Sequence, residues 1–286
     1  MRTTSEAPVA EPQPVKRAVR GGAGRDAAAD PATLEGPAVQ IQALEHSFGE
    51  LEVIAHLDLS LRPGEVLGIV GPSGCGKSTL LELVSGLRRQ SRGEIAVHGS
   101  SAPEARLTSC AYMPQRDLLL PWLSAIDNAS IALRNRGASR RAARRDAHPL
   151  FERFGLAGFE RARPAELSGG MRQRIAFLRT LLAGKPVLLL DEPFASLDAI
   201  TRAEMQEWLA SALAAESRSV ILVSHDVEEA LYLSDRVMVL SPRPAHALAE
   251  VSAPAPRARP RLDAVTDPAF TAARERALEG LTGASR

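Results

Sequence analysis

One short segment limits the fold of this chain more than any other. Its eight residues fit the pattern G-x-x-x-x-G-K-[ST] and read Gly71, Pro72, Ser73, Gly74, Cys75, Gly76, Lys77 and Ser78. A continuously apolar run over 66–70 precedes them, and apolar residues at helical spacing follow. Strand, glycine loop and helix in this order predict a phosphate-binding loop, because glycine lets backbone N–H groups turn inward and the helix N-terminus adds partial positive charge.

The side chains of this loop have separate tasks. We expect Lys77 to reach the β- and γ-phosphates of a nucleoside triphosphate, Ser78 to bind Mg²⁺ and Thr79 to assist at the α-phosphate. Cys75 could be a nucleophile, since a helix N-terminus lowers the pKa of a thiol. No histidine partner is indicated for Cys75, so we interpret it as a small residue that the loop tolerates.

The apolar runs elsewhere predict an α/β fold. Residues 186–190 and 219–223 are continuously apolar or nearly so, and each run is followed by an amphipathic helical pattern. Strands that alternate with helices indicate a mainly parallel sheet with helices on both faces. Before the phosphate-binding loop, 39–43 and 57–61 alternate apolar and polar residues, which predicts two half-buried antiparallel strands.

The helices after the two later strands are expected over 197–213 and 226–233. Asp226, with Glu229 three residues later, predicts an N-cap and a capping box for the second of these helices.

Composition divides the 286 residues into three parts, which are a disordered leader over 1–37, a large domain over 38–240 and a tail rich in Pro and Arg over 241–286. Within the large domain, 116–165 is helical and rich in Arg, so we expect an inserted helical subdomain there. In the tail, Asp267 and Pro268 are a good N-cap and first residue for a terminal helix that ends before Gly280.

Charge and cysteine content exclude several classes of protein. The net charge of +1 does not indicate a polyanion partner over the whole surface. Two cysteines are too few for a disulfide framework and lack the spacing of a zinc site, which favours a reducing cytosol. The apolar runs are far shorter than the roughly 20 residues that a membrane-spanning helix needs, so we expect no such helix.

Two adjacent carboxylates, Asp191 and Glu192, end the strand predicted over 186–190. Ligands of doubly wound folds bind at this end of the strands. Adjacent side chains on an extended segment point in different directions, so Asp191 can hold hydrated Mg²⁺ while Glu192 polarises the attacking water. Considered alone, the pair could equally be a solvated strand end.

A second glycine segment precedes the helical run that begins near residue 171. Ser168, Gly169 and Gly170 alone are typical of a loop that starts a helix. Beside a phosphate-binding loop, they can form a second anion-binding helix N-terminus. One chain cannot easily close both glycine loops on the same γ-phosphate, whereas a second subunit can.

In this order the motifs resemble those of the ATP-binding cassette family, specifically the nucleotide-binding subunits of bacterial importers, over about 39–240. Residues 167–173 are similar to the LSGGQ-type sequence, with Met171 where Gln is often found. Gln115 corresponds to the Q-loop glutamine, which joins the metal and the attacking water to the helical subdomain. Residues 196–198 resemble the D-loop, and His225 resembles the switch histidine that contacts the γ-phosphate.

The resemblance implies a RecA-like P-loop NTPase core, an antiparallel β subdomain and the inserted helical subdomain. It also implies ATP hydrolysis with Mg²⁺. The catalytic residues would be Glu192, His225 and Gln115, and the metal would be held by Ser78, Gln115 and Asp191. The nucleotide would contact Phe48, residues 71–79, Ser168, Gly169, Gly170, Gln173 and Asp198. Phe48 falls where the family stacks an aromatic ring on adenine, and its alternative is a core aromatic. The alternative for His225 is an ordinary buried histidine.

The family architecture further implies partners. Two copies pair head to tail around ATP, at the cytoplasmic face of the inner membrane, and drive separate permease subunits supplied by a solute-binding protein. The segment 114–122, with 191–194 and the tail helix, looks like the nitrate, sulfonate and taurine importers, and thiamine-pyrimidine precursor uptake is a similar member. The solute is not encoded in this chain, and no nucleic-acid partner is expected.

Two surface features have open interpretations. The apolar stretch 118–123 can grip a permease helix or pack within the helical subdomain. Six arginines between 134 and 145 can form a solvated helix face or contact anionic lipid or a partner, and they are Arg134, Arg136, Arg140, Arg141, Arg144 and Arg145.

Two other functions compete with the importer. A cassette ATPase that acts on DNA or ribosomes usually carries two cassettes or a long coiled coil, whereas this sequence has one phosphate-binding loop and no sustained heptads. A P-loop kinase or GTPase leaves Ser168, Gly169, Gly170 and His225 unexplained.

Overall fold

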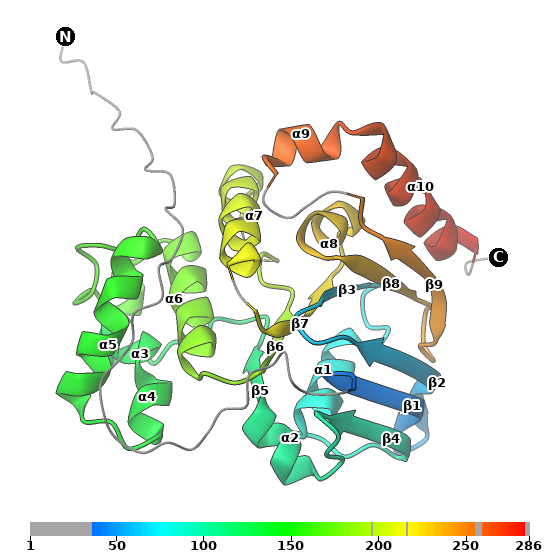
Figure 1. Ribbon diagram of the computed structural model, residues 1–286, viewed down its shortest axis with the longest axis horizontal. Coiled ribbons are helices and arrows are strands. Elements are labelled where there is room, and N and C mark those ends of the chain that lie inside the picture. Colours follow the sequence, from blue (N-terminus) through cyan, green and yellow to red (C-terminus); the bar gives the residue numbers. More distant parts are fainter. Residues whose placement is uncertain (1–35, 196, 216, 255–258, 284–286) are drawn as a thin grey trace.

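The computed structural model describes residues 36–195, 197–215, 217–254 and 259–283 (Figure 1). Nearly all of the predicted leader over 1–37 lies outside the described residues, as does Ser196 of the D-loop segment.

A mainly parallel sheet forms the centre of the described chain, as predicted. Its strand order is β5-β6-β7-β3-β8-β9, and only β9 runs antiparallel to its neighbour. The strands are β3 (Val66–Val70), β5 (Cys110–Met113), β6 (Val187–Asp191), β7 (Ser219–Ser224), β8 (Arg236–Leu240) and β9 (Ala247–Ser252). The three apolar runs of the sequence are the adjacent strands β6, β7 and β3, which are buried throughout because both faces of the sheet are covered.

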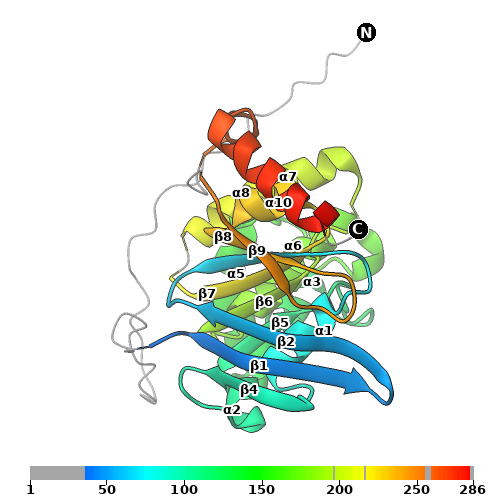
Figure 2. The ribbon, with the colours of Figure 1, turned by 90° about the vertical axis from the view of Figure 1, so that its right-hand side faces the viewer.

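A second, antiparallel sheet has the order β2-β1-β4 in the described chain. Its strands are β1 (Val39–Phe48), β2 (Leu51–Leu61) and β4 (Arg92–Val97). Val39 lies opposite both Leu61 and Val97, so the predicted pairing of the first two alternating segments is confirmed. Figure 2 shows these three strands side by side, at the opposite end of the molecule from the C-terminal helix.

Helix α1 (Lys77–Ser85) packs between the two sheets. Its Leu80 and Leu83 are fully buried in one core with Ile41 of β1 and Leu189 of β6. The neighbouring Leu188 of β6 faces the other core, because side chains alternate along a strand. That core is covered by α6 (Gly169–Leu182), α7 (Ala199–Ala214) and α8 (Val227–Leu233).

A helical unit lies beside the parallel sheet, on the side away from the antiparallel sheet (Figure 1). It follows strand β5 and contains α3 (Ala125–Ala129), α4 (Ile131–Asn135), α5 (Arg140–Arg153) and the start of α6. Trp208 of α7 packs against Phe154 and Phe177, with ring centroids 5.0 and 5.3 Å apart, and so connects this unit to the helices on the sheet. The short helix α2 (Pro103–Ser109) lies instead near β4.

Two helices end the described chain, α9 (Arg261–Val265) and α10 (Pro268–Gly283). Asp267 caps α10 by accepting a hydrogen bond from the Ala269 N–H at 2.9 Å. The prediction that this helix ends before Gly280 is wrong. Gly280 lies inside the helix against β9, where an added Cβ would be at an ordinary contact distance of 3.4 Å from Ala249, and the helix continues to Gly283.

The start of α8 is only partly as predicted. Asp226 is the N-cap and accepts hydrogen bonds from the N–H groups of Glu228 and Glu229. No capping box forms, because the Asp226 N–H donates to the Ser224 hydroxyl and the Glu229 side chain turns into the interior. The part of the chain described by the structure contains no helix long and apolar enough to span a bilayer.

Candidate functional site

The phosphate-binding loop connects β3 to α1 and surrounds the ammonium group of Lys77, which hydrogen-bonds to carbonyl oxygens of the loop. Gly74 and Gly76 have φ angles of +76° and +120°, which favour glycine, and a Cβ on Gly76 would lie 2.8 Å from Val53. The Lys77 side chain is buried and donates to the carbonyls of Gly71 at 2.9 Å and Pro72 at 3.1 Å. These contacts place the ammonium group within the curve of the loop.

A cavity of about 350 Å³ opens above this loop. It brings together loop residues, an aromatic ring of β1, the predicted Q-loop glutamine and one carboxylate at the end of β6. The lining residues are Phe48, Leu51, Val53, Ser73, Gly74, Gly76, Lys77, Ser78, Thr79, Gln115, Glu192 and Arg243. Groups that are more than 140 residues apart in the sequence therefore face one space.

Asp191 is buried at the carboxyl end of β6 and is held on both oxygens. The Ser78 hydroxyl donates to Oδ1 at 3.1 Å, and the Tyr112 hydroxyl donates to Oδ2 at 2.9 Å. Burial raises the pKa of Asp191, and the hydrogen bonds from Tyr112 and Ser78 oppose that shift. The carboxylate thus adjoins the hydroxyl of the phosphate-binding loop, as the sequence predicted.

Glu192 points to different partners from those of Asp191. Its Oε2 accepts a hydrogen bond from Gln115 Nε2 at 3.1 Å and lies 3.4 Å from His225 Nδ1. Its Oε1 lies 3.7 Å from the ammonium nitrogen of Lys77. One carboxylate therefore joins the phosphate-binding loop, the Q-loop position and the end of β7.

The backbone of Glu192 is strained. Its φ is +42°, in the left-handed region that L side chains rarely adopt. The Glu192 N–H donates to the Val223 carbonyl of β7 at 2.9 Å, which holds the turn in place. Such strain persists where surrounding structure enforces it, and it is concentrated at functional sites.

The structure places the second glycine segment elsewhere. Ser168 caps α6 by accepting a hydrogen bond from the Met171 N–H at 3.2 Å, and neither it nor the two glycines after it line the cavity above the phosphate-binding loop. Gln173 is buried within α6, and Asp198 caps α7 through the N–H groups of Ile200 and Thr201. These predicted nucleotide contacts are not brought to the cavity by the described chain itself.

Three of the alternatives considered from the sequence are wrong. Phe48 is 41% exposed, with the guanidinium of Arg88 over its ring at 4.6 Å, so it is not a core aromatic. The His225 side chain is 48% exposed, so it is not an ordinary buried histidine. Cys75 is buried, and burial raises the pKa of its thiol, which does not suit a nucleophile.

Two polar residues of the site, Tyr112 and Arg243, were not predicted, and neither were the apolar lining residues Leu51 and Val53. Tyr112 lies on β5 opposite Leu189, so its place beside Asp191 follows from parallel pairing that the sequence does not specify. The only sequence signal for Tyr112 was its position, three residues before the predicted Q-loop residue Gln115. Arg243 lies three residues after the end of β8 and lines the cavity because the chain turns toward it there. Nothing in the sequence around Arg243 indicates this position.

Comparisons with known proteins show the family. The model of the family described as ABC transporter matches residues 54–195. The formylaminopyrimidine import ATP-binding protein ThiZ of Halalkalibacterium halodurans is 45% identical over 202 residues, which cover 71% of this chain and 78% of that protein. The aliphatic sulfonates import ATP-binding protein SsuB 1 of Rhodococcus jostii is 44% identical over 203 residues, with 71% and 79% covered.

Solved structures share the fold. MJ0796, described as a bacterial ABC transporter cassette in a dimeric structure, aligns with a TM-score of 0.66 and 25% identity over 76% of this chain and 99% of that one. The protein cbiO1 from Clostridium perfringens aligns with a TM-score of 0.67 and 22% identity, covering 77% and 90%. With the motifs, the site and the relatives in agreement, this chain belongs to the ABC transporter family, as one of its ATP-hydrolysing cassettes.

Proposed function

We propose that this chain is the ATP-hydrolysing subunit of a bacterial importer and that it drives solute uptake through separate membrane subunits. The observation that carries the proposal is the Glu192 carboxylate, at which Lys77, Gln115 and His225 meet within 3.7 Å. A positioned carboxylate can accept the proton of an attacking water, while cationic and amide groups stabilise the charge of a transferring phosphoryl group.

Each residue has a distinct role in this proposal. Glu192 orients the water and accepts its proton, and Lys77 holds the β- and γ-phosphates from within its loop. His225 contacts the γ-phosphate, and the exposed ring of Phe48 stacks on adenine. The Gly74 and Gly76 segment turns its N–H groups toward phosphate oxygens.

The residues beside Asp191 fit Mg²⁺. Magnesium prefers hard oxygen ligands and is commonly held by one or two carboxylates together with substrate phosphates. The Ser78 hydroxyl and Asp191 Oδ1 lie 3.1 Å apart, and the amide of Gln115 is the third candidate ligand. When bound there, the ion neutralises negative charge on the phosphates.

We further propose that a second copy completes the site. Ser168 is exposed at the N-terminus of α6, Gly169 is half-buried and Gly170 is buried, and none of the three lines the cavity of their own chain. The exposed end of this segment is therefore available to a partner's γ-phosphate. Asp198 caps α7, and Thr201 in the first turn of that helix lies beside Gly170, where an added Cβ would be 3.1 Å from it. The dimeric MJ0796 cassette supports this arrangement. ATP would then favour the closed pair by its higher affinity for it, and hydrolysis would release the pair.

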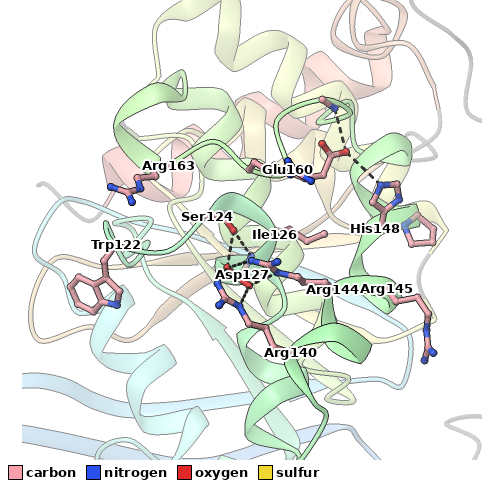
Figure 3. Close-up of a pocket in the computed structure, with 13 residues that line it drawn as sticks. Trp122, Ser124, Ile126, Asp127, Arg140, Arg144, Arg145, His148, Glu160 and Arg163 are labelled. Carbon is pink, nitrogen blue, oxygen red and sulfur yellow. Dashed lines mark hydrogen bonds and ion pairs between the residues drawn. The ribbon is translucent and has the colours of Figure 1, made fainter.

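The contact with the membrane subunits is proposed at the apolar stretch after Gln115. Leu119 is buried, whereas Leu118 and Trp122 are 58% and 69% exposed, so the stretch both packs inside and presents apolar surface. Trp122 borders a cavity of about 1030 Å³ in the helical unit (Figure 3). A large exposed aromatic beside a hollow is typical of a binding surface.

The arginines of this unit are partly engaged within the chain. Arg140 and Arg144 both pair with the buried Asp127, as the dashed lines in Figure 3 show. Among the described residues, the ion pair of Arg145 is with its neighbour Asp146. The remaining positive charge favours an anionic contact at the membrane or on the permease.

The relatives suggest the solute class. Their names refer to import of aliphatic sulfonates and of formylaminopyrimidine, which agrees with the nitrate, sulfonate and taurine group and its pyrimidine-precursor member. We propose that the chain acts as a peripheral subunit at the cytoplasmic face of the inner membrane, indirectly supplied by a solute-binding protein.

Coexpression with the adjacent permease genes tests the proposal. The tagged chain should copurify from detergent-solubilised membranes with a multi-span protein, and the complex should hydrolyse ATP faster when the cognate solute-binding protein is added. Salt-sensitive binding to nucleic acid, without a membrane partner, would favour a cassette that acts on DNA or ribosomes.

A further inference from the structure

One cation at the nucleotide cavity takes no part in the proposed hydrolysis. Arg243 lies in the bend after β8, is exposed, and lines the cavity above the phosphate-binding loop. In the part of the chain that the structure describes, no carboxylate pairs with its guanidinium, and the guanidinium donates no hydrogen bond. An exposed arginine without a protein partner can turn its five N–H donors toward a ligand.

Backbone contacts on both sides of Arg243 fix the bend beside the cavity. The Ser241 N–H donates to the His246 carbonyl at 3.0 Å, which closes the bend. Ala245 is buried, and its N–H donates to the Val53 carbonyl of β2 at 2.8 Å. Val53 itself lines the nucleotide cavity. The fold therefore holds the backbone of Arg243 at the cavity wall and leaves its side chain free to contact a ligand.

The guanidinium of Arg243 reaches the phosphate-binding loop. A Cβ added at Gly74 would lie 3.5 Å from its Nη2 atom, which is an ordinary contact distance. Burial raises the pKa of the Cys75 thiol in the same loop, and the positive charges of Lys77 and Arg243 act in the opposite direction. The charge of Arg243 therefore acts on the loop from the Gly74 side.

The charges at the cavity favour an anionic ligand beside Arg243. Among the described residues that line the cavity, Lys77 and Arg243 are cationic and Glu192 is the carboxylate. Glu192 Oε1 lies 3.7 Å from the Lys77 ammonium nitrogen, so these two charges partly offset each other. The charge of Arg243 is left without a counter-charge in the cavity, and the phosphate chain of a nucleotide supplies one.

We propose that Arg243 is a further nucleotide-binding residue, whose guanidinium donates to the phosphate chain of ATP on the Gly74 side of the loop. The inference rests on the proposed function, because it takes this cavity as the ATP site. A planar guanidinium offers parallel N–H donors to two oxygens of one phosphate group. Because Arg243 and the loop belong to the same chain, the contact forms before a second copy closes on the nucleotide.

Two ligands of the full chain test this contact, namely ATP and inorganic tripolyphosphate, which has the phosphate chain but no base or ribose. Each displaces a fluorescent ATP analogue in buffer without Mg²⁺, so that no nucleotide is hydrolysed. Arg243→Gln should weaken binding of both ligands about tenfold, because both lose the same charge-assisted hydrogen bonds. Arg243→Lys keeps the charge and should bind both ligands more tightly than Arg243→Gln.

Steady-state kinetics give a second measurement. In Mg²⁺, Arg243→Gln should raise the KM for ATP and leave kcat nearly unchanged, because Arg243 binds the nucleotide and does not act on the attacking water. Arg145→Gln, which removes an exposed arginine of α5, should change neither ligand affinity nor KM. The midpoint temperature of unfolding without nucleotide should be the same for both variants, since both side chains are exposed.

The outcomes separate this contact from the proposed function. If Lys77→Ala weakens ATP binding but Arg243→Gln leaves both affinities unchanged, the Arg243 contact is wrong and the ATP site stands. If Arg243→Gln weakens binding of ATP but not of tripolyphosphate, Arg243 contacts the base or the ribose, and the phosphate contact is again wrong. A wild-type chain that binds neither ligand would instead contradict the proposed function itself.

Discussion

The side-chain amide of Gln206 donates a hydrogen bond to the buried carboxylate of Glu229 at 3.0 Å, which joins α7 to α8 in the interior. Burial raises the pKa of Glu229, and hydrogen bonds from Ser224 and Gln206 oppose that shift. Ser224 directly precedes His225 at the end of β7. Arg261 of α9 donates to the other side of the Gln206 amide at 2.8 Å. A polar chain thus extends from the C-terminal helices to Ser224, the residue before His225.

We therefore expect Gln206→Leu to disturb His225 without touching the nucleotide. The change leaves the buried Glu229 carboxylate with fewer donors, which should lower the free energy of unfolding by about 1–3 kcal/mol. The kcat of ATP hydrolysis should fall more than KM changes, because the phosphate-binding loop is intact. Ser211→Ala on the exposed side of α7 is the control. Equal loss of both kinetic parameters would argue for a general structural defect.

Removing the charge of Glu192 tests its role as the base. Glu192→Gln keeps the hydrogen-bonding shape, so ATP should still bind, but hydrolysis should fall by about 10²-fold or more. A long-lived ATP-bound pair should then be visible by size exclusion. Glu250→Gln, on the exposed side of β9, should leave hydrolysis unchanged. A Glu192→Gln variant that hydrolyses ATP at the normal rate would contradict the assignment.

The shared site predicts different effects for its two halves. Lys77→Ala should weaken nucleotide binding in the single chain, because the buried ammonium is lost from the loop. Ser168→Arg should leave that binding unchanged and prevent closure of the pair, because a large side chain then blocks the α6 N-terminus. Fluorescent-nucleotide binding and light scattering measure the two steps. Normal closure and hydrolysis by Ser168→Arg would show that one chain suffices.

Acid should reduce the stabilisation that Asp127 provides. Arg144, then Arg140, holds the pKa of this buried carboxyl well below its ordinary value near 3.9. A lowered pKa in the folded state stabilises the fold above the unfolded-state pKa, and the stabilisation is lost as the pH falls through the folded-state pKa. Arg144→Gln should therefore lower the free energy of unfolding by about 1–2 kcal/mol at pH 7, and by less at pH 3.

Urea denaturation at both pH values measures this difference. Arg145→Gln is the control, because its partner is the exposed Asp146, and its effect should stay within about 0.5 kcal/mol. A destabilisation by Arg144→Gln that is equal at pH 3 and pH 7 would mean that the ion pair is not its source.

The exposed tryptophan should matter only in the assembled importer. Trp122→Ala removes a large aromatic from the surface beside the helical-unit cavity, so binding to the permease should weaken by about 30-fold, or roughly 2 kcal/mol. ATP hydrolysis by the isolated chain should not change. Phe159→Ala, another exposed aromatic, is the comparison. Normal assembly of Trp122→Ala would place the contact elsewhere.

The sequence by itself determined those parts of the protein that depend on interactions between residues close together in the chain. The glycine loop between an apolar run and a helix, and the three buried strands at β3, β6 and β7, follow from spacing, backbone freedom and periodicity within a few residues. The separate directions of Asp191 and Glu192 were predicted from extended chain, whereas in the structure β6 ends at Asp191 and Glu192 follows with a φ of +42°.

Only the tertiary structure decided which distant groups meet. Strand order places Tyr112 beside Asp191, and the path of the chain after β8 brings Arg243 to the nucleotide cavity. The Glu229 side chain points inward and forms no capping box, because the side-chain amide of Gln206 on α7 donates a hydrogen bond to it. Burial of the Arg106 side chain likewise depends on packing around α2. Such contacts join segments far apart in the sequence, and their energies depend on burial, which local pattern does not encode.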